Sequence, residues 1–516
     1  MFILNVSLIP AVGTAVLLAS FGLDLDVVTS SNTLGYLTSV SHSITIDYIT
    51  ISCLSMLCSC FLIAGLFYWH YFSWHSDYLI INIQGFVLSM VYLILSSNVV
   101  SSFIAWEILG MSSFFLILYY SVYYSSRAAT VTVVSSRLGD VGFFLFICCV
   151  VNDSFSSVSI ACCVFICLLI ISKSAVFPLT SWLLEAMRAP TPVSSLVHSS
   201  TLVAAGIVLV CRYETYLLNG PYSYALLVLC LLTISMSATA AFFYSDTKKV
   251  VALSTCNNIS WCYVYLYNGM IELCLIQLVC HGVFKCVLFC LVGDLLINSS
   301  NSQNKSMHFY FSSAGYSIIT NMVCLFISGA PFMGVYFSKH LFISYMSELE
   351  SLSILVLTMV GLSLSFLYTF RLLNIINIEL NSSSSGFNNT FYSCVNIAPV
   401  LLLINGVISN SLLEDNLPSL ATNALVNTLI VLMSGVGYTL CYSNINKWHS
   451  GLYGQDFFVF DAIAIYGTMG SIGYTSSIFR WESSLATRLV HQRSTYSLGL
   501  NFLLVISLMF YLLILV

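Results

Sequence analysis

The chain has 516 residues, of which 59% are hydrophobic and 7% are charged, and its formal net charge is −5. Soluble globular chains carry about 25% charged residues, so this composition excludes that class. A nucleic-acid-binding protein is also excluded, because the sequence contains no run of basic residues.

Repeated apolar runs predict a polytopic helical membrane protein, because a helix of about 20 residues crosses the hydrocarbon layer of a bilayer. In chain order we expect spans at 2–21, 48–69, 79–98, 100–121, 130–151, 157–174, 192–212, 223–243, 249–268, 270–293, 311–330, 352–373, 394–411, 422–442 and 497–516. The segments 175–188 and 335–347 are too short to cross alone, so we expect half-helices there. The polar segment 22–46 is expected to be a loop.

The 19 cysteines lie mostly inside apolar runs, as at Cys148 and Cys149. No paired CxxC spacing accompanies them, so we expect buried apolar thiols rather than a disulfide framework or metal ligands. The amino terminus shows no basic or cleavable leader, which favours synthesis inside an organelle or a bacterium.

Two prolines interrupt apolar segments beside lysines. Pro178 follows Lys173 by five residues, and Pro331 precedes Lys339 by eight. Proline removes a helix donor, and at membrane depth the broken backbone survives only against protein or water. Paired interrupted helices in the two halves of a chain predict an inverted-repeat transporter fold.

Ionisable side chains inside apolar runs are candidate functional residues, because each costs roughly 2.5–3.5 kcal/mol at the bilayer centre. Glu107 lies inside the run 101–120 and is either a functional carboxylate or a helix-end carboxylate. Arg137 and Asp140 share one helix face, so they can pair. That pair is either structural, near the membrane surface, or part of a coupling device.

A histidine and a lysine stand one turn apart at His281 and Lys285, in the run 271–296. The alternative for His281 alone is a satisfied core histidine. Together with Lys173 and Lys339, these residues are typical of proton movement, because a desolvated lysine releases its proton and a histidine relays one. The sequence shows no phosphate-binding loop or metal-ligand cluster, so we expect no cofactor within this chain.

Six stretches between residues 103 and 340 carry a resemblance to a known family. They are FIAWEILGMSSFFLI around Glu107, SSRLGDVGF around Asp140, KSAVFPLTSWLLEAMRAPTPVSSLVHSSTLVAAG from Lys173 through His198, DTKKVVALST from Asp246, HGVFKCVLF from His281, and FSKH around Lys339. In this order they are similar to the antiporter-like, proton-translocating subunits of respiratory NADH dehydrogenase. The stretch from Lys173 to His198 resembles subunit 5 of that family more than subunits 2 and 4.

The resemblance implies an all-α polytopic membrane protein with an antiporter-like fold of about 14–16 transmembrane helices. It implies two inverted repeats, broken helices, and a carboxy-terminal lateral helix followed by an anchor span. The corresponding regions are the amino-terminal helices 1–98, the proton-translocating core 99–375, the later helices 376–455, and the lateral helix and anchor 456–516. Forty residues of lateral helix would reach about 60 Å at 1.5 Å per residue.

The resemblance also implies roles at the start of the proton path. Glu107 would be the carboxylate near the proton entrance and the coupling point between subunits. Lys173 would be its partner on a broken helix, and Arg137 and Asp140 would tune that lysine.

Further roles follow along the same path. His198 and His281 would relay protons towards Lys285, and Lys339 on the second broken helix would mark the exit. Two positions depart from the family pattern. Gln277 stands four residues before His281, where many relatives carry another histidine, and His340 follows Lys339, where an acid is common.

We therefore expect a core membrane subunit of respiratory NADH:ubiquinone oxidoreductase, multi-pass in the mitochondrial inner membrane and organelle-encoded. It would translocate protons while NADH, FMN, iron–sulfur clusters and ubiquinone bind in other subunits. Its partners would be antiporter-like subunit 4, accessory subunits and membrane lipid. The alternatives are a cation/proton antiporter subunit of the same fold and a structural scaffold.

Overall fold

The computed structural model describes residues 45–72, 77–151, 160–177, 179–217, 223–244, 246–298, 314–330, 333–348 and 352–376, with isolated positions 428, 432, 435 and 436. The expected spans 2–21, 394–411 and 497–516 and the lateral helix lie outside the described residues. So do nearly all of the segment 22–46 and all but those isolated positions of the span 422–442.

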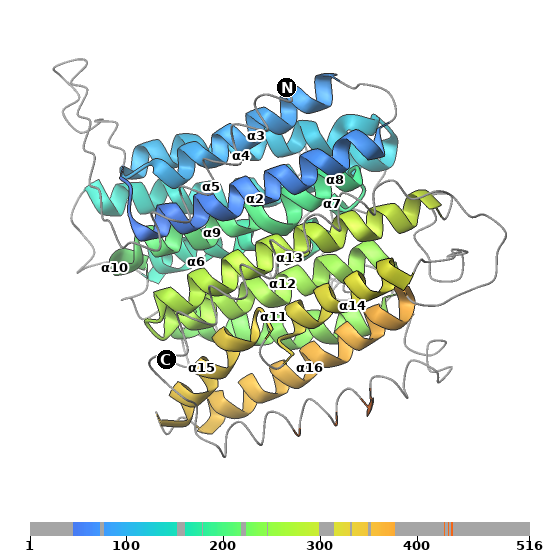
Figure 1. Ribbon diagram of the computed structural model, residues 1–516. Coiled ribbons are helices and arrows are strands. Elements are labelled where there is room, and N and C mark those ends of the chain that lie inside the picture. The colour runs from blue at the N-terminus through green and yellow to red at the C-terminus, as the bar shows by residue number, and fades with distance from the viewer. Residues whose placement is uncertain are drawn as a thin grey trace, which may run out of the picture.

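The described chain is a bundle of helices (Figure 1). Their bounds in chain order are α2 (Tyr48–Tyr71), α3 (Asp77–Leu95), α4 (Val99–Ile117), the 3-10 turn η1 (Leu118–Tyr120), α5 (Tyr123–Val151), α6 (Ile160–Ser174), α7 (Ser181–Ala186), α8 (Thr191–Val193), the π-helix η3 (Ser194–Thr201), α9 (Leu202–Arg212), α10 (Glu214–Leu217), α11 (Ser223–Phe243), α12 (Thr247–Tyr267), α13 (Ile271–Asn298), α14 (Ala314–Ser328), α15 (Tyr336–Glu348) and α16 (Leu352–Ile376). Within the described ranges, eight helices are long and apolar enough to cross a membrane.

The apolar runs predicted these helices well. Each expected span between 48 and 373 coincides with a helix or a consecutive helical segment, with ends that differ by a few residues. The largest difference is at α5, which begins at Tyr123 rather than at residue 130. The backbone N–H of Val122 donates to the Ser125 hydroxyl over 3.0 Å, so local capping starts the helix earlier than the apolar pattern does.

Both predicted helix breaks are present. Between α6 and α7 the backbone leaves the helical region at Ala175, whose φ is +53°. Between α14 and α15 it does so at Gly329 and Gly334, with φ of +87° and +52°. The expected half-helices correspond to α7 and α15. Pro178 and Pro331 themselves lie outside the described residues.

Each broken helix is the fourth member in a series of five helical units. The first series is α3, α4, α5, α6 with α7, and α8 with η3 and α9. The second series is α11, α12, α13, α14 with α15, and α16. The helices thus follow the same order in both series, with the break in the fourth member of each. This order is the one expected if the two halves are repeats of each other, as the sequence predicts.

Helix α13 runs through the middle of the bundle and packs against α2, α12, α14 and η3 (Figure 1). Glycine permits its close approach to α2, because a Cβ at Gly282 would lie 2.7 Å from Met56 Sδ. A Cβ at Gly293 would likewise lie 2.7 Å from Phe67 Cζ. Small residues serve this purpose in membrane bundles, where close van der Waals packing holds helices together.

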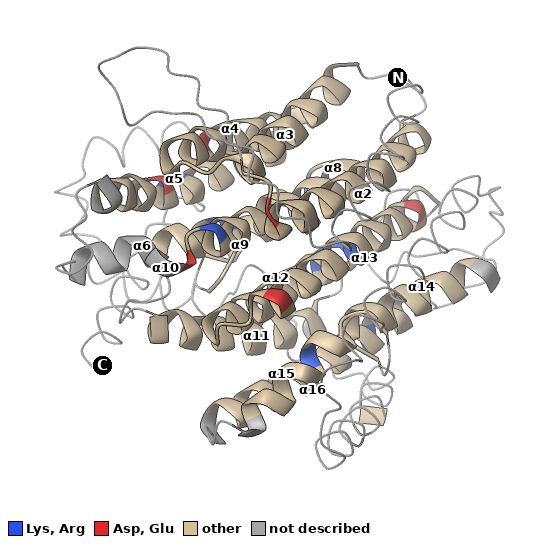
Figure 2. Ribbon diagram, turned by 60° about the vertical axis from the view of Figure 1, so that its left-hand side comes forward, with Lys and Arg blue, Asp and Glu red and all other residues tan. Residues whose placement is uncertain are grey.

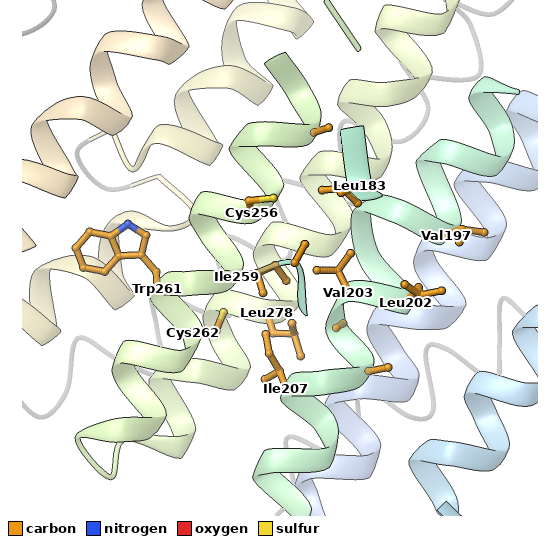
Figure 3. Packing of buried hydrophobic residues seen from close by; sticks show 14 of the residues in the cluster. Leu183, Val197, Leu202, Val203, Ile207, Cys256, Ile259, Trp261, Cys262 and Leu278 are labelled. Carbon is orange, nitrogen blue, oxygen red and sulfur yellow. The ribbon is translucent and has the colours of Figure 1, made fainter. Parts of the chain in front are cut away.

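The core between η3, α9, α12 and α13 is apolar. Figure 3 shows Val203 and Ile207 of α9 directed towards Ile259 of α12 and Leu278 of α13. These side chains are buried, as are the thiols of Cys256 and Cys262 in the same layer. The cysteines whose side chains the structure describes are free thiols, and all but Cys58 and Cys148 are buried, as the sequence predicted. The prediction was wrong for Cys148, which is exposed on the outer surface of α5.

Candidate functional site

Lys173 stands in the last turn of α6, directly before the first helix break, and is 3% exposed. Its ammonium Nζ lies 5.1 Å from the ring centroid of Trp106 on α4. A Cβ at Gly110 would lie 3.3 Å from this nitrogen, so α4 leaves room for the ammonium at a glycine. Helix C-termini favour cations because their carbonyl dipoles point outward.

Two carboxylates and an arginine surround this position. Arg137 Nη1 lies 2.5 Å from Glu107 Oε2 and 3.1 Å from Asp140 Oδ2. Trp106 Nε1 donates to Asp140 Oδ1 over 3.0 Å. The predicted pairing of Arg137 with Asp140 is confirmed. The sparse charged positions on α4, α5 and the other helices can be followed in Figure 2.

The direct ion-pair partner of Glu107 differs from the partner that the resemblance implied. The carboxylate pairs with Arg137, which comes from α5, rather than with Lys173. Lys173 remains within electrostatic reach of both Glu107 and Asp140. Since Arg137 is 48% exposed and Glu107 is 24% exposed, their pair lies on an outer face of this chain, whereas Asp140 and Lys173 are buried.

Lys173 and His198 both line a small cavity, with room for about one water molecule. Trp182 also contributes to its wall. The remaining polar lining consists of hydroxyl side chains from α4, α5 and α6, namely Ser113, Thr132, Ser135, Ser136 and Ser172. Each hydroxyl donates to a carbonyl of its own helix. Their oxygen lone pairs are therefore available to a water molecule or to the ammonium.

His198 lies on the π-helix η3 and is fully buried. Hydroxyl side chains bond across the wide turns, as Thr201 does by donating to the carbonyl of Leu196 over 2.8 Å. Neither ring nitrogen of His198 has a hydrogen-bond partner in the structure. A buried polar nitrogen without a partner is costly, so this imidazole is suited to a transient partner such as water. π-Helical turns often occur at functional sites.

Lys285 and His281 are buried on α13, one turn apart as predicted. Lys285 Nζ donates to the Ser254 hydroxyl and, over 3.4 Å, to the carbonyl of Val251, both on α12. Neither ring nitrogen of His281 has a hydrogen-bond partner in the structure. The charges of Lys285 and Lys339 both act on this imidazole.

Lys339 stands in the first turn of α15, just after the second break, and is 1% exposed. Its Nζ donates to the carbonyl of Ser328, the last residue of α14, over 3.0 Å, and to the Ser365 hydroxyl over 3.4 Å. The Lys339 ammonium thus lies by the C-terminal end of α14, whereas Lys173 is itself in the last turn of α6 and directs its ammonium towards α4. Among the ion pairs of the described ranges, none joins Lys339 to a carboxylate, in keeping with His340 at the following position.

The sequence analysis missed three residues of this polar interior. Trp106, next to Glu107 in the sequence, connects Asp140 to Lys173. Lys248 is buried at the start of α12 and donates to the carbonyl of Ala189 over 3.4 Å. Arg371 is buried on α16 and donates to the carbonyl of Tyr244 over 3.0 Å. Both cations stand near a helix end, where sequence alone indicates a membrane surface.

The described residues contain no group of three or more His, Cys, Asp and Glu side chains that could hold a metal ion. The arrangement therefore consists of buried lysines, histidines and hydroxyls, together with one cluster of charges at α4, α5 and α6.

The sequence of this chain is similar to a known protein family and to several known proteins. Residues 96–367 match the family described as NADH:quinone oxidoreductase/Mrp antiporter, TM. The chain is 34% identical over 355 residues to NADH-ubiquinone oxidoreductase chain 5 of Locusta migratoria, a match that covers 64% of this chain and 60% of that one. It is 31% identical over 430 residues to chain 5 of Anopheles gambiae, covering 77% and 73% of the two chains.

Solved structures show the same fold. A chain of respiratory complex I from Thermus thermophilus with bound NADH aligns with a TM-score of 0.69 at 14% identity, covering 83% of this chain and 94% of that one. A chain of the Mrp complex from Dietzia sp. aligns with a TM-score of 0.62 at 19% identity, covering 89% and 59%.

Proposed function

This chain belongs to the chain 5 branch of the NADH:quinone oxidoreductase/Mrp antiporter family, and we propose on that premise that it carries protons across a membrane. It would do so as a core subunit of NADH:ubiquinone oxidoreductase. The observation that carries this proposal is the pair of buried lysines, Lys173 and Lys339, one at each helix break. Buried lysines at membrane depth are costly and mark ion or proton pathways.

The proposed proton path begins at the charge cluster. Glu107 and Asp140 attract a proton on Lys173, whereas Arg137 opposes it. A shift of Arg137 away from the carboxylates would strengthen the attraction, and its return would weaken it. Such a shift would convert a conformational change elsewhere in the complex into uptake or release of a proton at Lys173.

From Lys173, the hydroxyl-lined cavity leads to His198. His198 and His281 would relay protons towards Lys285, because a neutral imidazole accepts at one nitrogen and donates at the other. Lys339 would release protons on the exit side. The hydroxyls on this path would order water molecules between the titrating groups.

The other parts of the reaction would take place in neighbouring subunits. NADH, FMN, iron–sulfur clusters and ubiquinone would bind there, so electrons would not pass through this chain. Its partners would be antiporter-like subunit 4, accessory subunits and lipid, in the mitochondrial inner membrane, and the chain would be organelle-encoded. The half-exposed pair Glu107–Arg137 supports a neighbour at that face, because an exposed ion pair within a span needs protein or water beside it.

A cation/proton antiporter subunit is the second candidate, favoured by the fold shared with the Mrp complex. The two functions differ in their dependence on sodium. Proton movement coupled to NADH oxidation would proceed without sodium in the medium, whereas antiport would stop.

The experiment compares Glu107→Gln and Lys173→Met in the assembled complex. We expect both variants to lower coupled NADH oxidation while the amount of assembled complex stays normal. Lys249→Met is the matched control, because Lys249 is partly exposed and pairs with Asp246 at 3.8 Å, away from the proposed path. Normal turnover with a normal number of protons moved in both variants would rule out the proposal.

A further inference from the structure

A row of hydrogen-bonded, buried side chains runs from the neighbourhood of Lys339 to that of Lys285. The proton path proposed above does not use these side chains. The row begins at Ser338, the residue before Lys339 on α15. Ser338 donates its hydroxyl to Gln277 Oε1 on α13 over 2.5 Å. Gln277 Nε2 donates to Asn258 Oδ1 on α12 over 3.2 Å. All three polar side chains are fully buried.

The backbone carbonyl of Ser254 determines which group donates and which accepts in each hydrogen bond of this row. Asn258 Nδ2 donates to it over 2.9 Å, and a carbonyl can only accept. Asn258 must therefore turn its oxygen to Gln277, which must present its NH₂ group there. The Gln277 oxygen then faces Ser338, whose hydroxyl also lies 3.0 Å from the carbonyl oxygen of Val335 in its own helix. The single hydroxyl proton must go to Gln277, because the amide oxygen would otherwise lack a donor. The hydroxyl of Ser254 accepts from Lys285, so the row ends beside this second lysine.

A row of this composition cannot conduct protons. A relay group must take up a proton at one atom and release another, as imidazole does. A carboxamide NH₂ group does not release its protons at physiological pH, and a backbone carbonyl has none to release. What the row can do is hold three helices in register beside Lys339. Buried hydrogen bonds serve this purpose well, because breaking one leaves its partners unsatisfied.

The neighbouring imidazole is placed differently. His281 lies one turn from Gln277 and one turn from Lys285 on α13, so all three share a face. Its ring nitrogens have no hydrogen-bond partner, and the charges of Lys285 and Lys339 both act on it. Protons that pass between the two lysines therefore have a titrating group at His281 and none at Gln277.

We propose that Gln277 is a positioning residue that fixes the half-helix α15, and with it Lys339, against α12 and α13 without carrying protons. The row Ser338–Gln277–Asn258 is an amide clamp. This inference rests on the proposed function, because it assigns the clamp a task in proton translocation. It also assigns a role to the position where Gln277 departs from the histidine that many members of the resembled family carry.

The test uses the assembled complex in sealed vesicles, with NADH oxidation and proton uptake measured together. Gln277→Leu removes both hydrogen bonds of the amide, and we expect turnover to fall about tenfold, since small misplacements of reacting groups have large effects on rate. Ser338→Ala removes the hydroxyl that donates to Gln277 and should lower turnover as Gln277→Leu does. Ser338→Thr keeps a hydroxyl at this position and should keep turnover near that of the parent. Ser363→Ala is the control, because that buried hydroxyl donates within its own helix to the carbonyl of Val360.

The variant Gln277→Glu tests whether turnover depends on the hydrogen bonds of Gln277 or only on the volume of its side chain. A protonated carboxyl can donate to Asn258 and accept from Ser338, whereas the carboxylate can only accept. Turnover of this variant should therefore be near normal at low pH and fall as the pH rises and the carboxyl loses its proton. The parent protein should show no such loss, because an amide does not titrate.

Two results would overturn the inference. One is full turnover of Gln277→Leu with normal amounts of assembled complex. The other is a pH profile of Gln277→Glu that matches the parent. If Lys173→Met lowers proton pumping in the same assay, either result would rule out the positioning role of Gln277 and leave the proposed function intact. Unchanged pumping in both Lys173→Met and Glu107→Gln would instead rule out the proposed function itself.

Discussion

Trp106 donates its indole N–H to Asp140 across the interface of α4 and α5, over 3.0 Å, while its ring lies beside the Lys173 ammonium. One side chain thus orients the carboxylate and contacts the cation that this carboxylate attracts. Because the two contacts use different parts of the indole, they can be separated by substitution.

Trp106→Phe keeps an aromatic ring near Lys173 but removes the donor to Asp140. A buried acceptor that loses its partner costs about 1–3 kcal/mol, so we expect coupled turnover to fall roughly fivefold or more. Trp69→Phe, an exposed aromatic on α2, is the control. Unchanged turnover of Trp106→Phe at equal amounts of assembled complex would show that the indole N–H has no part in the site.

Arg137→Gln removes the cation that opposes a proton on Lys173. Glu107 and Asp140 then act on the ammonium without opposition, so Lys173 should hold its proton more tightly. We expect slower turnover near neutral pH and an optimum displaced to higher pH, where release becomes easier. Arg188→Gln, which breaks a pair with Glu185 at 3.0 Å instead, should leave the optimum in place. An unshifted optimum in Arg137→Gln would mean that the arginine does not control Lys173.

His198→Gln replaces the imidazole of the π-helix with a polar group that does not titrate. If the imidazole relays protons, turnover should fall by roughly two orders of magnitude, which is typical of a lost acid–base group. His70→Gln, at a half-buried histidine paired with Asp294 at 3.4 Å, is the comparison. Normal proton uptake by His198→Gln would assign this histidine to packing alone.

Gly334→Ala tests the second helix break. Gly334 has φ of +52°, and an added Cβ would lie 2.9 Å from the carbonyl oxygen of Phe326. Both effects strain the backbone, at a cost of about 1–3 kcal/mol. The thermal unfolding of the assembled complex should therefore occur at lower temperature. Gly85→Ala, where nothing lies within 4 Å of the added Cβ, should not lower it.

The sequence predicted the helices and both breaks because the bilayer imposes a simple rule on apolar length. It also predicted the pair Arg137–Asp140, because two residues three apart on one helix must share a face. The contact of Trp106 with Asp140 joins residues 34 positions apart. Periodicity indicates which face of a helix is polar, but it does not indicate which other helix meets that face.

Two further features depend on packing rather than on pattern. In the π-helix around His198, the backbone N–H of Leu202 donates to the carbonyl of Val197, five residues back, and the Thr201 hydroxyl donates to that of Leu196. The role of Gln277 depends on Asn258 and Ser338, which come from two other helices. From the sequence, Gln277 was visible as a departure from a family pattern, but its partners were not.

The proposed proton path depends most on the lysines at the two helix breaks. The direct test is the number of protons moved per electron transferred by the assembled complex in sealed vesicles, for Lys173→Met and Lys339→Met with Lys249→Met as the control. We expect both variants at the breaks to lower this ratio or abolish turnover, while the control matches the parent. A ratio and a turnover equal to those of the parent in both variants would contradict the proposed path.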